Sequence, residues 1–279
     1  MRRNFAQILK SAKIDYRKEY KKLYDILFTK DIGDDYHEKH SIYDLFDESF
    51  TSFCFRGTCL SLQEFDKENG FSFPSPDNET DIEMDNLILL MEYFYNLLIA
   101  YQSCAGFGGL FFNCQFYIEH IISVCEAIGY KQAFEDGFCI FVEKDSVATA
   151  VAESELIPED FSYKIITYNH HSMRGDIEGK KTILVKFASI LEGKRKDLEK
   201  VNSTLANDLF YIFNNFNVRH NNFDSSVKGK YKPYIAKMKK DDLEKWYDEA
   251  YQMCLLAFME LEQADRKPKF DALKAEIEK

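Results

Sequence analysis

Glycine and proline are scarce in this chain, which holds 12 Gly and 5 Pro in 279 residues. Most tight turns need these residues, because glycine supplies positive φ and proline presets φ at the turn. So few of them cannot serve the many turns of an all-β protein. Hydrophobic residues make up 46% of the chain and aromatic residues 15%, which excludes a disordered composition. The sequence therefore predicts a folded, mainly α-helical protein, long enough for one large or two modest domains.

Positive charge is also in short supply. Lys and Arg number 36 against 47 Asp and Glu, which gives a formal charge of −11. This balance excludes a general nucleic-acid coat, because a polyanion is repelled by a protein of the same sign unless a local basic patch holds it. Any contact with RNA must come from such a patch.

Long apolar runs and disulfide frameworks are missing as well. The most apolar stretch, Met84–Tyr101, falls short of the roughly 20 residues that cross a bilayer, and it predicts a buried central helix. The chain starts Met-Arg-Arg-Asn-Phe-Ala-Gln, which leads into a polar helix expected over 4–28 and not into an apolar signal core. Seven cysteines without framework spacing indicate reduced core thiols. We therefore expect a cytoplasmic protein without membrane contact.

One break divides the helical pattern. Proline and small polar residues gather at 70–81, where they exclude a helix and indicate a linker. We expect an N-terminal helical unit over 1–72 before it and a larger helical domain over 82–265 after it. Inside the larger domain, weak alternation over 129–144 with a Glu-Asp-Gly turn predicts a small β-hairpin. A charged, frayed tail is expected over 266–279.

Helical spacing dominates the second half. A short helix is expected over 145–155 and a strand over 163–168. The apolar spacing over 176–220 fits either one bent helix or two helices with a tight break. The surest helix covers 241–261, begins with a capping-box pattern and is expected to pack antiparallel against 203–220. Its apolar stripe consists of Leu243, Trp246, Tyr247, Ala250, Met253, Cys254, Ala257, Phe258 and Leu261.

The candidate site lies where the apolar helical face of 203–220 reaches polar residues. Arg219 and His220 stand there beside four asparagines, Asn214, Asn217, Asn221 and Asn222. Arginine is a fixed cation with a forked geometry suited to phosphate, and histidine titrates close to neutral pH. Together they could form an acid–base site for phosphodiester chemistry. The alternative is a helix end at which His220 closes the core and the asparagines act as caps.

A lysine-rich segment follows at once, and its cations alternate with tyrosines. Such a pattern suits a surface that follows the backbone of single-stranded RNA and stacks on its bases. We therefore assign RNA binding to Asn222, Lys228, Lys230, Tyr231 and Lys232. A solvated loop is the alternative.

Arg174 can join the same phosphate site if the loop after His170-His171 folds toward Arg219. Adjacent side chains on a strand point to opposite faces, so this histidine pair is a poor chelate. Carboxylates and histidines also gather at 31–41, as Asp31, Asp34, Asp35, His37, Glu38 and His40. A metal site is conceivable there, but no second cluster matches the usual ligand patterns. We expect neither a metal nor a cofactor.

A helical hairpin with an Asn-x-Arg-polar signature, here Asn217-Val218-Arg219-His220, resembles the HEPN superfamily, known from abortive-infection and toxin ribonucleases. The preceding segments are similar to the linking region of some abortive-infection HEPN proteins. They are Ile128-Gly129-Tyr130, Phe134-Glu135-Asp136-Gly137-Phe138-Cys139-Ile140 and the alanine-rich 147–153. The resemblance covers residues 120–262.

The resemblance implies a HEPN-like helical bundle, RNA as partner, a homodimer with two facing sites, and a metal-independent endoribonuclease that acts in defence or as a toxin. It carries over to Asn217, Arg219 and Asn221, which with His220 form the predicted catalytic set. In active HEPN nucleases the catalytic histidine follows the arginine after several residues. Here His220 follows Arg219 at once, and the expected positions hold Phe223, Asp224 and Ser225. Either His220 takes the role, or the protein is an inactive HEPN-like module that binds RNA or a regulatory protein partner.

Overall fold

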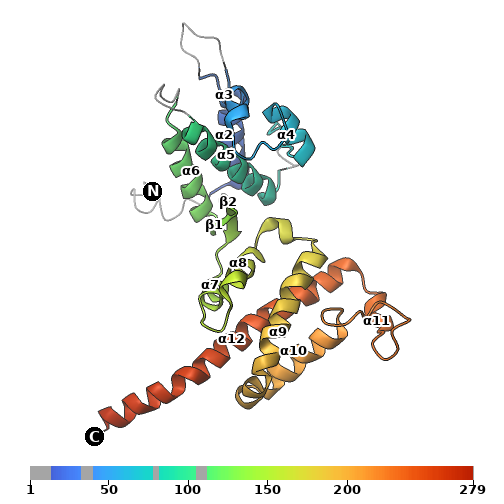
Figure 1. The fold of residues 1–279 in the computed structure, drawn as a ribbon. Coiled ribbons are helices and arrows are strands. Elements are labelled where there is room, and N and C mark those ends of the chain that lie inside the picture. The colour runs from blue at the N-terminus through green and yellow to red at the C-terminus, as the bar shows by residue number, and fades with distance from the viewer. Residues whose placement is uncertain (1–13, 33–39, 78–81, 105–111, 279) are drawn as a thin grey trace, which may run out of the picture. The chain divides into compact units, whose positions relative to one another are not determined.

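A computed structural model describes residues 14–32, 40–77, 82–104 and 112–278. Eleven α-helices and one two-stranded β-hairpin form the regular structure of these residues (Figure 1). The prediction of a mainly helical protein with a small hairpin is therefore confirmed. The chain divides into two compact units, which meet in the sequence between Lys144 and Asp145.

The first unit opens with short helices whose starts are encoded locally. They are α2 (Tyr16–Tyr24), its π-helical continuation η1 (Asp25–Thr29), α3 (Ile42–Ser49), η2 (Phe50–Ser52) and α4 (Leu62–Asn69). The Asp15 side chain accepts from two N–H groups at the start of α2, and Ser41 and Asp44 form a capping box at α3. Such caps pair N–H groups that the helix itself leaves open. The helix expected over 4–28 is confirmed from Tyr16 onward, and residues 4–13 lie outside the described part.

Helix α5 (Met84–Cys104) forms the centre of the first unit. It is apolar on most faces and contacts α2, α3, α6 (Cys114–Ala127) and β2 (Phe138–Glu143). The predicted domain boundary at 70–81 is therefore wrong, since α5 and the elements before that segment share one core. The described residues up to 77 do form the expected coil, but the chain only crosses the surface of the unit there.

Among the described helices, α5 alone is long and apolar enough to cross a membrane by length and composition. Within that apolar stretch, 61% is buried inside the protein. The core helix of a folded unit meets the same criteria. The packing of α5 explains its apolar faces without a bilayer.

The hairpin joins β1 (Tyr130–Glu135) to β2 in antiparallel register. Asp136 and Gly137 make the turn with φ of 50° and 88°, the left-handed conformation that a tight hairpin turn requires. Asn96 on α5 donates to the Cys139 carbonyl at 2.8 Å and accepts from the Cys139 N–H at 2.9 Å. The predicted hairpin is confirmed, and it belongs to the first unit.

The seven cysteines are free thiols, as expected. Five of them are buried, whereas Cys54 and Cys104 are exposed, which the sequence did not indicate. Burial raises the pKa of the Cys114 and Cys139 thiols to about 11. These two thiols therefore stay protonated and unreactive near neutral pH.

The second unit begins with α7 (Ser146–Ala152), which Asp145 caps, and α8 (Glu159–Thr167). The strand predicted over 163–168 is wrong, because this stretch lies in α8 and at its end. Two β-branched isoleucines in a short run suggested a strand. Phe161, Ile165 and Tyr168 instead bury one helical face, and Glu159 and Asp160 favour a helix start in the first turn.

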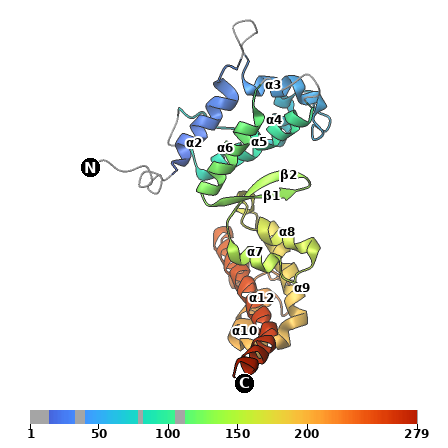
Figure 2. The same ribbon diagram turned by 90° about the vertical axis from the view of Figure 1, so that its left-hand side faces the viewer.

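Three long helices form a bundle in the second unit, and they lie side by side in Figure 2. They are α9 (Ile177–Val201), α10 (Ser203–Asn215) and α12 (Lys240–Ile277), with the short α11 (Pro233–Ala236) before the last. Asn202 separates α9 from α10, so the alternative with a tight break is correct.

Two side-chain bonds show that α10 and α12 run antiparallel, as predicted. Asn202 donates to Glu260 at 2.9 Å near one end, and the Tyr247 hydroxyl donates to the Phe216 carbonyl at 3.0 Å near the other. Tyr247 and Phe258 are fully buried in this bundle. Burying a large apolar side chain contributes about 1.5–3 kcal/mol.

Helix α12 differs from its prediction at both ends. The residue before it, Lys239, forms no side-chain cap, so the capping box expected at 241–244 is absent. At the other end the helix continues to Ile277, and the frayed tail expected over 266–279 is wrong for the described residues. Ala, Leu, Lys and Glu are strong helix formers, and an Arg266–Glu262 ion pair at i, i+4 supports this turn.

Candidate functional site

The asparagine-rich segment lies in a loop and not on a helix. Helix α10 ends at Asn215, and Asn217 has a φ of 58°, which a right-handed helix cannot contain. Asparagine tolerates this left-handed conformation better than other non-glycine residues. The predicted helix over 203–220 is thus too long, and Arg219 and His220 follow the helix instead of ending it.

Asn217 and Asn222 form a reciprocal clamp across this loop. The Asn217 N–H donates to Asn222 Oδ1 at 2.7 Å, and the Asn222 N–H donates to Asn217 Oδ1 at 3.2 Å. The Asn222 side-chain amide also donates to the carbonyls of Asn214 at 3.2 Å and Lys230 at 2.6 Å. The Lys232 N–H donates to the Asn222 carbonyl at 2.9 Å. One buried amide therefore ties the end of α10 to the lysine-rich segment.

The clamp corrects two predicted roles. Asn222 is 0% exposed and Asn217 is 4% exposed, so neither side chain is presented to a ligand. A buried amide with its hydrogen bonds made stabilises the fold, and removing it leaves its partners unpaired. Direct RNA contact by Asn222 is wrong, and Asn217 acts by shaping the loop. Asn221 is exposed, and its side chain accepts from the Phe223 N–H at 3.2 Å.

Arg219 and His220 are both accessible, but each already faces another side chain. Arg219 forms an ion pair with Glu192 of α9. His220 Nε2 lies 3.2 Å from Lys230 Nζ. Desolvation and then the charges of Lys230 and Arg219 lower the pKa of His220 below its ordinary value. The imidazole is therefore neutral at pH 7 and able to accept a proton.

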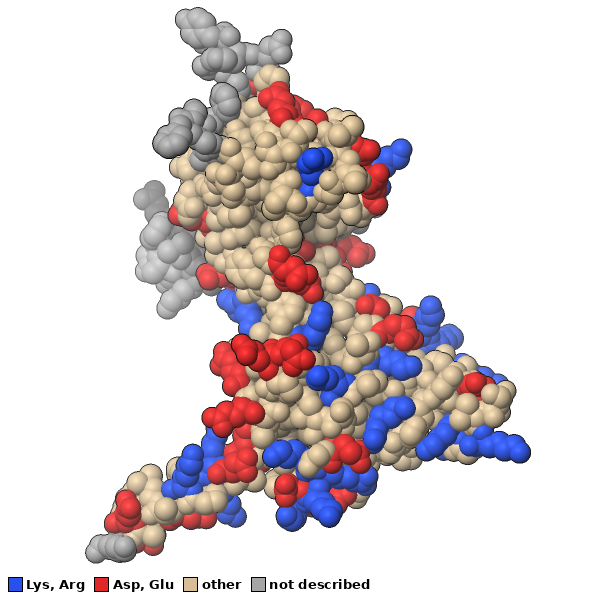
Figure 3. Space-filling model, in the orientation of Figure 1, with Lys and Arg blue, Asp and Glu red and all other residues tan. Residues whose placement is uncertain are grey.

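The lysine-rich segment is the stretch of the chain in which charge of one sign is most concentrated. Between Ser225 and Lys240 it holds six lysines and no acidic residue. Lys228 and Lys230 are exposed, and Tyr231 and Lys232 are half-buried. Figure 3 shows many Lys and Arg side chains over the elements α9 to α12, and few over the first unit.

The two units differ in charge accordingly. The first, Met1–Lys144, holds 14 Lys and Arg against 24 Asp and Glu, a formal charge of −10. The second holds 22 against 23, a formal charge of −1. The acidity of the chain therefore belongs almost entirely to the unit that lacks the lysine-rich segment.

Arg174 lies at the same end of the bundle as Arg219. It follows the short turn η4 (His171–Met173), and the next N–H, of Gly175, donates to Glu244 of α12 at 2.7 Å. The segment before Arg219 meets α12 one turn further on, through Phe216 and Tyr247. Both segments therefore contact the first turns of α12, and a phosphate site shared by Arg174 and Arg219 stays a prediction.

An aromatic groove beside the lysines escaped the sequence prediction. It has a volume of about 770 Å³ and lies between α11 and the first turns of α12. Its lining residues are Tyr234, Lys237, Met238, Lys239, Asp242, Lys245, Trp246 and Glu249. Trp246 was expected in the buried stripe of α12, but it is 43% exposed. The signal available in the sequence was the pair Asp242 and Glu249, which lie four residues before and three after Trp246 and so share its face of the helix.

A buried ion cluster supports the same end of the bundle. Lys180 of α9 donates to Glu244 and to Asp248 of α12 at 2.7 Å each. The Tyr168 hydroxyl also donates to Asp248 at 2.9 Å. Burial alone would raise the pKa of Glu244, but the hydrogen bonds from Lys180 and Gly175 hold it below its ordinary value. This cluster joins α9, α12 and the residue that ends α8, and it buries Lys180 while Asp248 stays half exposed.

The segment 31–41, where a metal site was conceivable but not expected, lies mostly outside the described residues. Asp34, Asp35, His37 and Glu38 lie outside the described residues, and His40 Nδ1 lies 3.7 Å from a Glu48 carboxylate oxygen. The expectation that the protein needs no metal remains a prediction.

The fold and the site together define a two-unit helical protein whose second unit carries a basic loop fixed by buried asparagines. No model of a known protein family, no curated protein and no solved structure matches this chain.

Proposed function

We propose that the second unit binds single-stranded RNA through the lysine-rich segment 225–240. The main support is the set of six lysines without an acidic residue, and the Asn217–Asn222 clamp holds the part of this segment up to Lys232 in one loop. A held loop presents its cations without a large ordering cost on binding, because the backbone is already in place. Lys228, Lys230 and Lys232 bind phosphates, and Tyr231 packs beside them.

The charge of the whole chain does not oppose this function. Screening limits the reach of exposed charges to roughly 8 Å at physiological salt. A phosphate at Lys228 therefore responds to the charges within that reach, among them the exposed lysines of its own segment.

Catalysis at Arg219 and His220 is the second candidate, and the neutral imidazole favours it. His220 takes a proton from the ribose 2′-OH, whose oxygen attacks the phosphorus and displaces the 5′-oxygen, which takes a proton from water. Arg219 stabilises the charge on the phosphate oxygens. The substrate phosphate must first displace Glu192 from Arg219. The HEPN resemblance adds a homodimer with two facing sites, a defence or toxin role in the cytoplasm, and a regulatory protein partner as part of this proposal.

Binding is tested with labelled single-stranded RNA and fluorescence anisotropy at several salt concentrations. We expect the triple variant Lys228→Gln/Lys230→Gln/Lys232→Gln to weaken binding and to lower the salt slope by about 2, since each phosphate contact contributes roughly 0.7. The control is Lys194→Gln/Lys196→Gln/Lys200→Gln on α9, which removes equal charge from exposed positions. Equal loss in both variants would reduce the proposal to unspecific attraction.

Catalysis needs a separate measurement. The wild type and Arg219→Ala/His220→Ala are expressed in cells, and growth and RNA integrity are compared. Slower growth and RNA cleavage that disappear in the variant support the nuclease. Identical behaviour of the two, together with RNA binding in vitro, leaves the binding module.

A further inference from the structure

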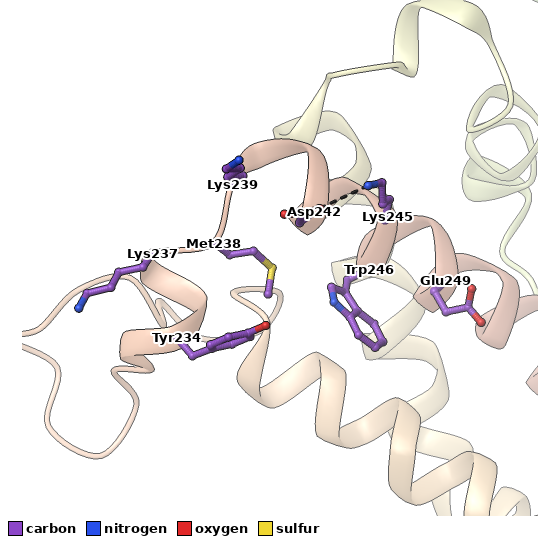
Figure 4. Close-up of a pocket in the computed structure, with 8 residues that line it drawn as sticks. All are labelled: Tyr234, Lys237, Met238, Lys239, Asp242, Lys245, Trp246 and Glu249. Atoms are coloured by element: carbon purple, nitrogen blue, oxygen red, sulfur yellow. Dashed lines mark hydrogen bonds and ion pairs between the residues drawn. The ribbon is translucent and has the colours of Figure 1, made fainter.

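The groove between α11 and α12 has two aromatic walls that the fold leaves open. Tyr234 is 77% exposed and Trp246 is 43% exposed. Figure 4 shows the two rings on either side of an open space, with the Met238 side chain above it. Large aromatic side chains dominate cores and interfaces, because leaving them in water costs the free energy of their burial. Two open rings that line one groove therefore offer a stacking surface to an occupant.

The Trp246 ring packs against a second aromatic ring. It lies 5.3 Å from the Phe216 ring, measured between centroids. Phe216 precedes the Asn217–Asn222 clamp, and its carbonyl accepts from the buried Tyr247 hydroxyl. The indole is thus braced by the same loop that carries the lysines, and it is preorganised for stacking.

The charges around the groove are not evenly placed. Lys237 follows α11 and Lys239 directly precedes α12, and the Lys237 side chain points away from the rings in Figure 4. Along α12, Asp242 accepts from Lys245 at 3.3 Å, and Glu249 lies beyond Trp246. A polyanion is therefore attracted to the link between α11 and α12 and repelled from the Glu249 end of the groove.

We propose that this groove takes one unstacked nucleobase of a single-stranded RNA between Tyr234 and Trp246, with the adjoining phosphates on Lys237 and Lys239. The proposal rests on the proposed RNA binding and assigns a base subsite to it. Bases stack on aromatic side chains irrespective of their identity, since every base has a π face. The cations beside the rings match the phosphates that every nucleotide carries.

The chain supplies its own probe, because Trp246 is its only tryptophan. Tryptophan fluorescence therefore reports this groove alone. The full chain is titrated with a short single-stranded oligoadenylate and, in parallel, with inorganic polyphosphate of similar charge. We expect the oligonucleotide to quench the emission by stacking and the polyphosphate to leave it nearly unchanged, although both bind the lysines.

Affinity for a labelled oligonucleotide provides the second measurement. Tyr234→Ala is expected to weaken binding roughly tenfold, within the range that one stacked base contributes. Tyr234 is largely exposed, so its removal leaves the fold intact. The matched control is Tyr211→Ala, an exposed tyrosine on α10, which should leave the affinity unchanged.

The outcomes separate the base subsite from RNA binding itself. RNA binding with unchanged Trp246 emission and full affinity in Tyr234→Ala overturns the subsite and leaves the proposed function standing. Equal quenching by polyphosphate also overturns it, since no base is then needed. Trp246 emission that changes with protein concentration alone shows that a second copy covers the groove. Absence of any RNA binding overturns both proposals.

Discussion

The two units solve the burial of polar groups in different ways. In the first, Asp66 accepts hydrogen bonds from the hydroxyls of Tyr43 at 2.7 Å and Tyr93 at 2.8 Å, so an acid is satisfied by neutral donors. In the second, Lys180 lies between Glu244 and Asp248, so charges are satisfied by opposite charges. Both networks tie helices together, but only the second depends on a cation.

The same contrast runs through the surfaces. The first unit carries a formal charge of −10, and the second carries −1 with six of its 18 lysines in the segment 225–240. The comparison shows that the net charge of a chain does not tell how charge is distributed over its surface. A chain of formal charge −11 still carries a segment of six lysines without an acidic residue.

The largest expected effect is on the ion cluster of the second unit. Lys180→Ala leaves two carboxylates facing each other, which should destabilise this unit by about 3 kcal/mol. This value is the lower end of the range for breaking a buried ion pair, because Asp248 is half exposed. Urea unfolding followed by Trp246 fluorescence measures the loss. The control Lys196→Ala, exposed on the same helix, should change stability by less than about 0.5 kcal/mol. Equal effects of the two would mean that the cluster does not support the bundle.

A smaller effect is expected from the asparagine clamp. Asn222→Ala leaves the Asn217 N–H and the Asn214 and Lys230 carbonyls without a partner, at a cost of about 2 kcal/mol. The loss should concentrate in residues 216–232 and be visible as faster amide hydrogen exchange there. Asn221→Ala, next in the chain but exposed, serves as the control and should exchange like the wild type. Unchanged exchange in Asn222→Ala would show that the loop does not need the clamp.

The smallest effect concerns pH, and its sign differs between the units. Glu244 has a lowered pKa in the fold, so its stabilisation is present above the unfolded value and is lost as pH falls through the folded value. Burial raises the pKa of Asp66, although its tyrosine partners act against this. Asp66 therefore favours the fold most when protonated, and that contribution is lost as pH rises through the raised pKa.

Acidification below about pH 4.5 should thus weaken the second unit relative to the first. Hydrogen exchange by mass spectrometry, corrected for the intrinsic exchange rate at each pH, resolves both units in the full chain. Asp66→Asn should remove the response that Asp66 contributes to the first unit. An equal loss of protection in both units would show that the two networks respond to acid in the same way.

Local patterns predicted most elements because their signals are short-range. Asp145 capping α7, the Asp136-Gly137 turn of the hairpin and the 3.6-residue stripe of α12 each act within a few residues. The strand predicted over 163–168 was wrong because the deciding contacts are long-range. Two isoleucines favour a strand locally, but a helix buries Phe161 and Ile165 against the core of the second unit.

The candidate site was predicted less well. The sequence directed attention to the segment 217–232, because its asparagines, Arg219 and lysines are adjacent in the chain. It could not assign their roles, because Asn221 and Asn222 are the same residue type in adjacent positions, one exposed and one buried. The groove was missed because it pairs Tyr234 with Trp246 from separate helices.

By itself, the sequence determined the helical class, the hairpin, the cysteine state and the position of the basic segment, since composition and short-range spacing decide these. Only the tertiary structure decided that the chain divides at Lys144, that Asn217 and Asn222 brace a loop, and that Trp246 faces solvent. The physical reason is that burial depends on which faces distant elements cover. The type of a single residue does not show which distant elements will cover it.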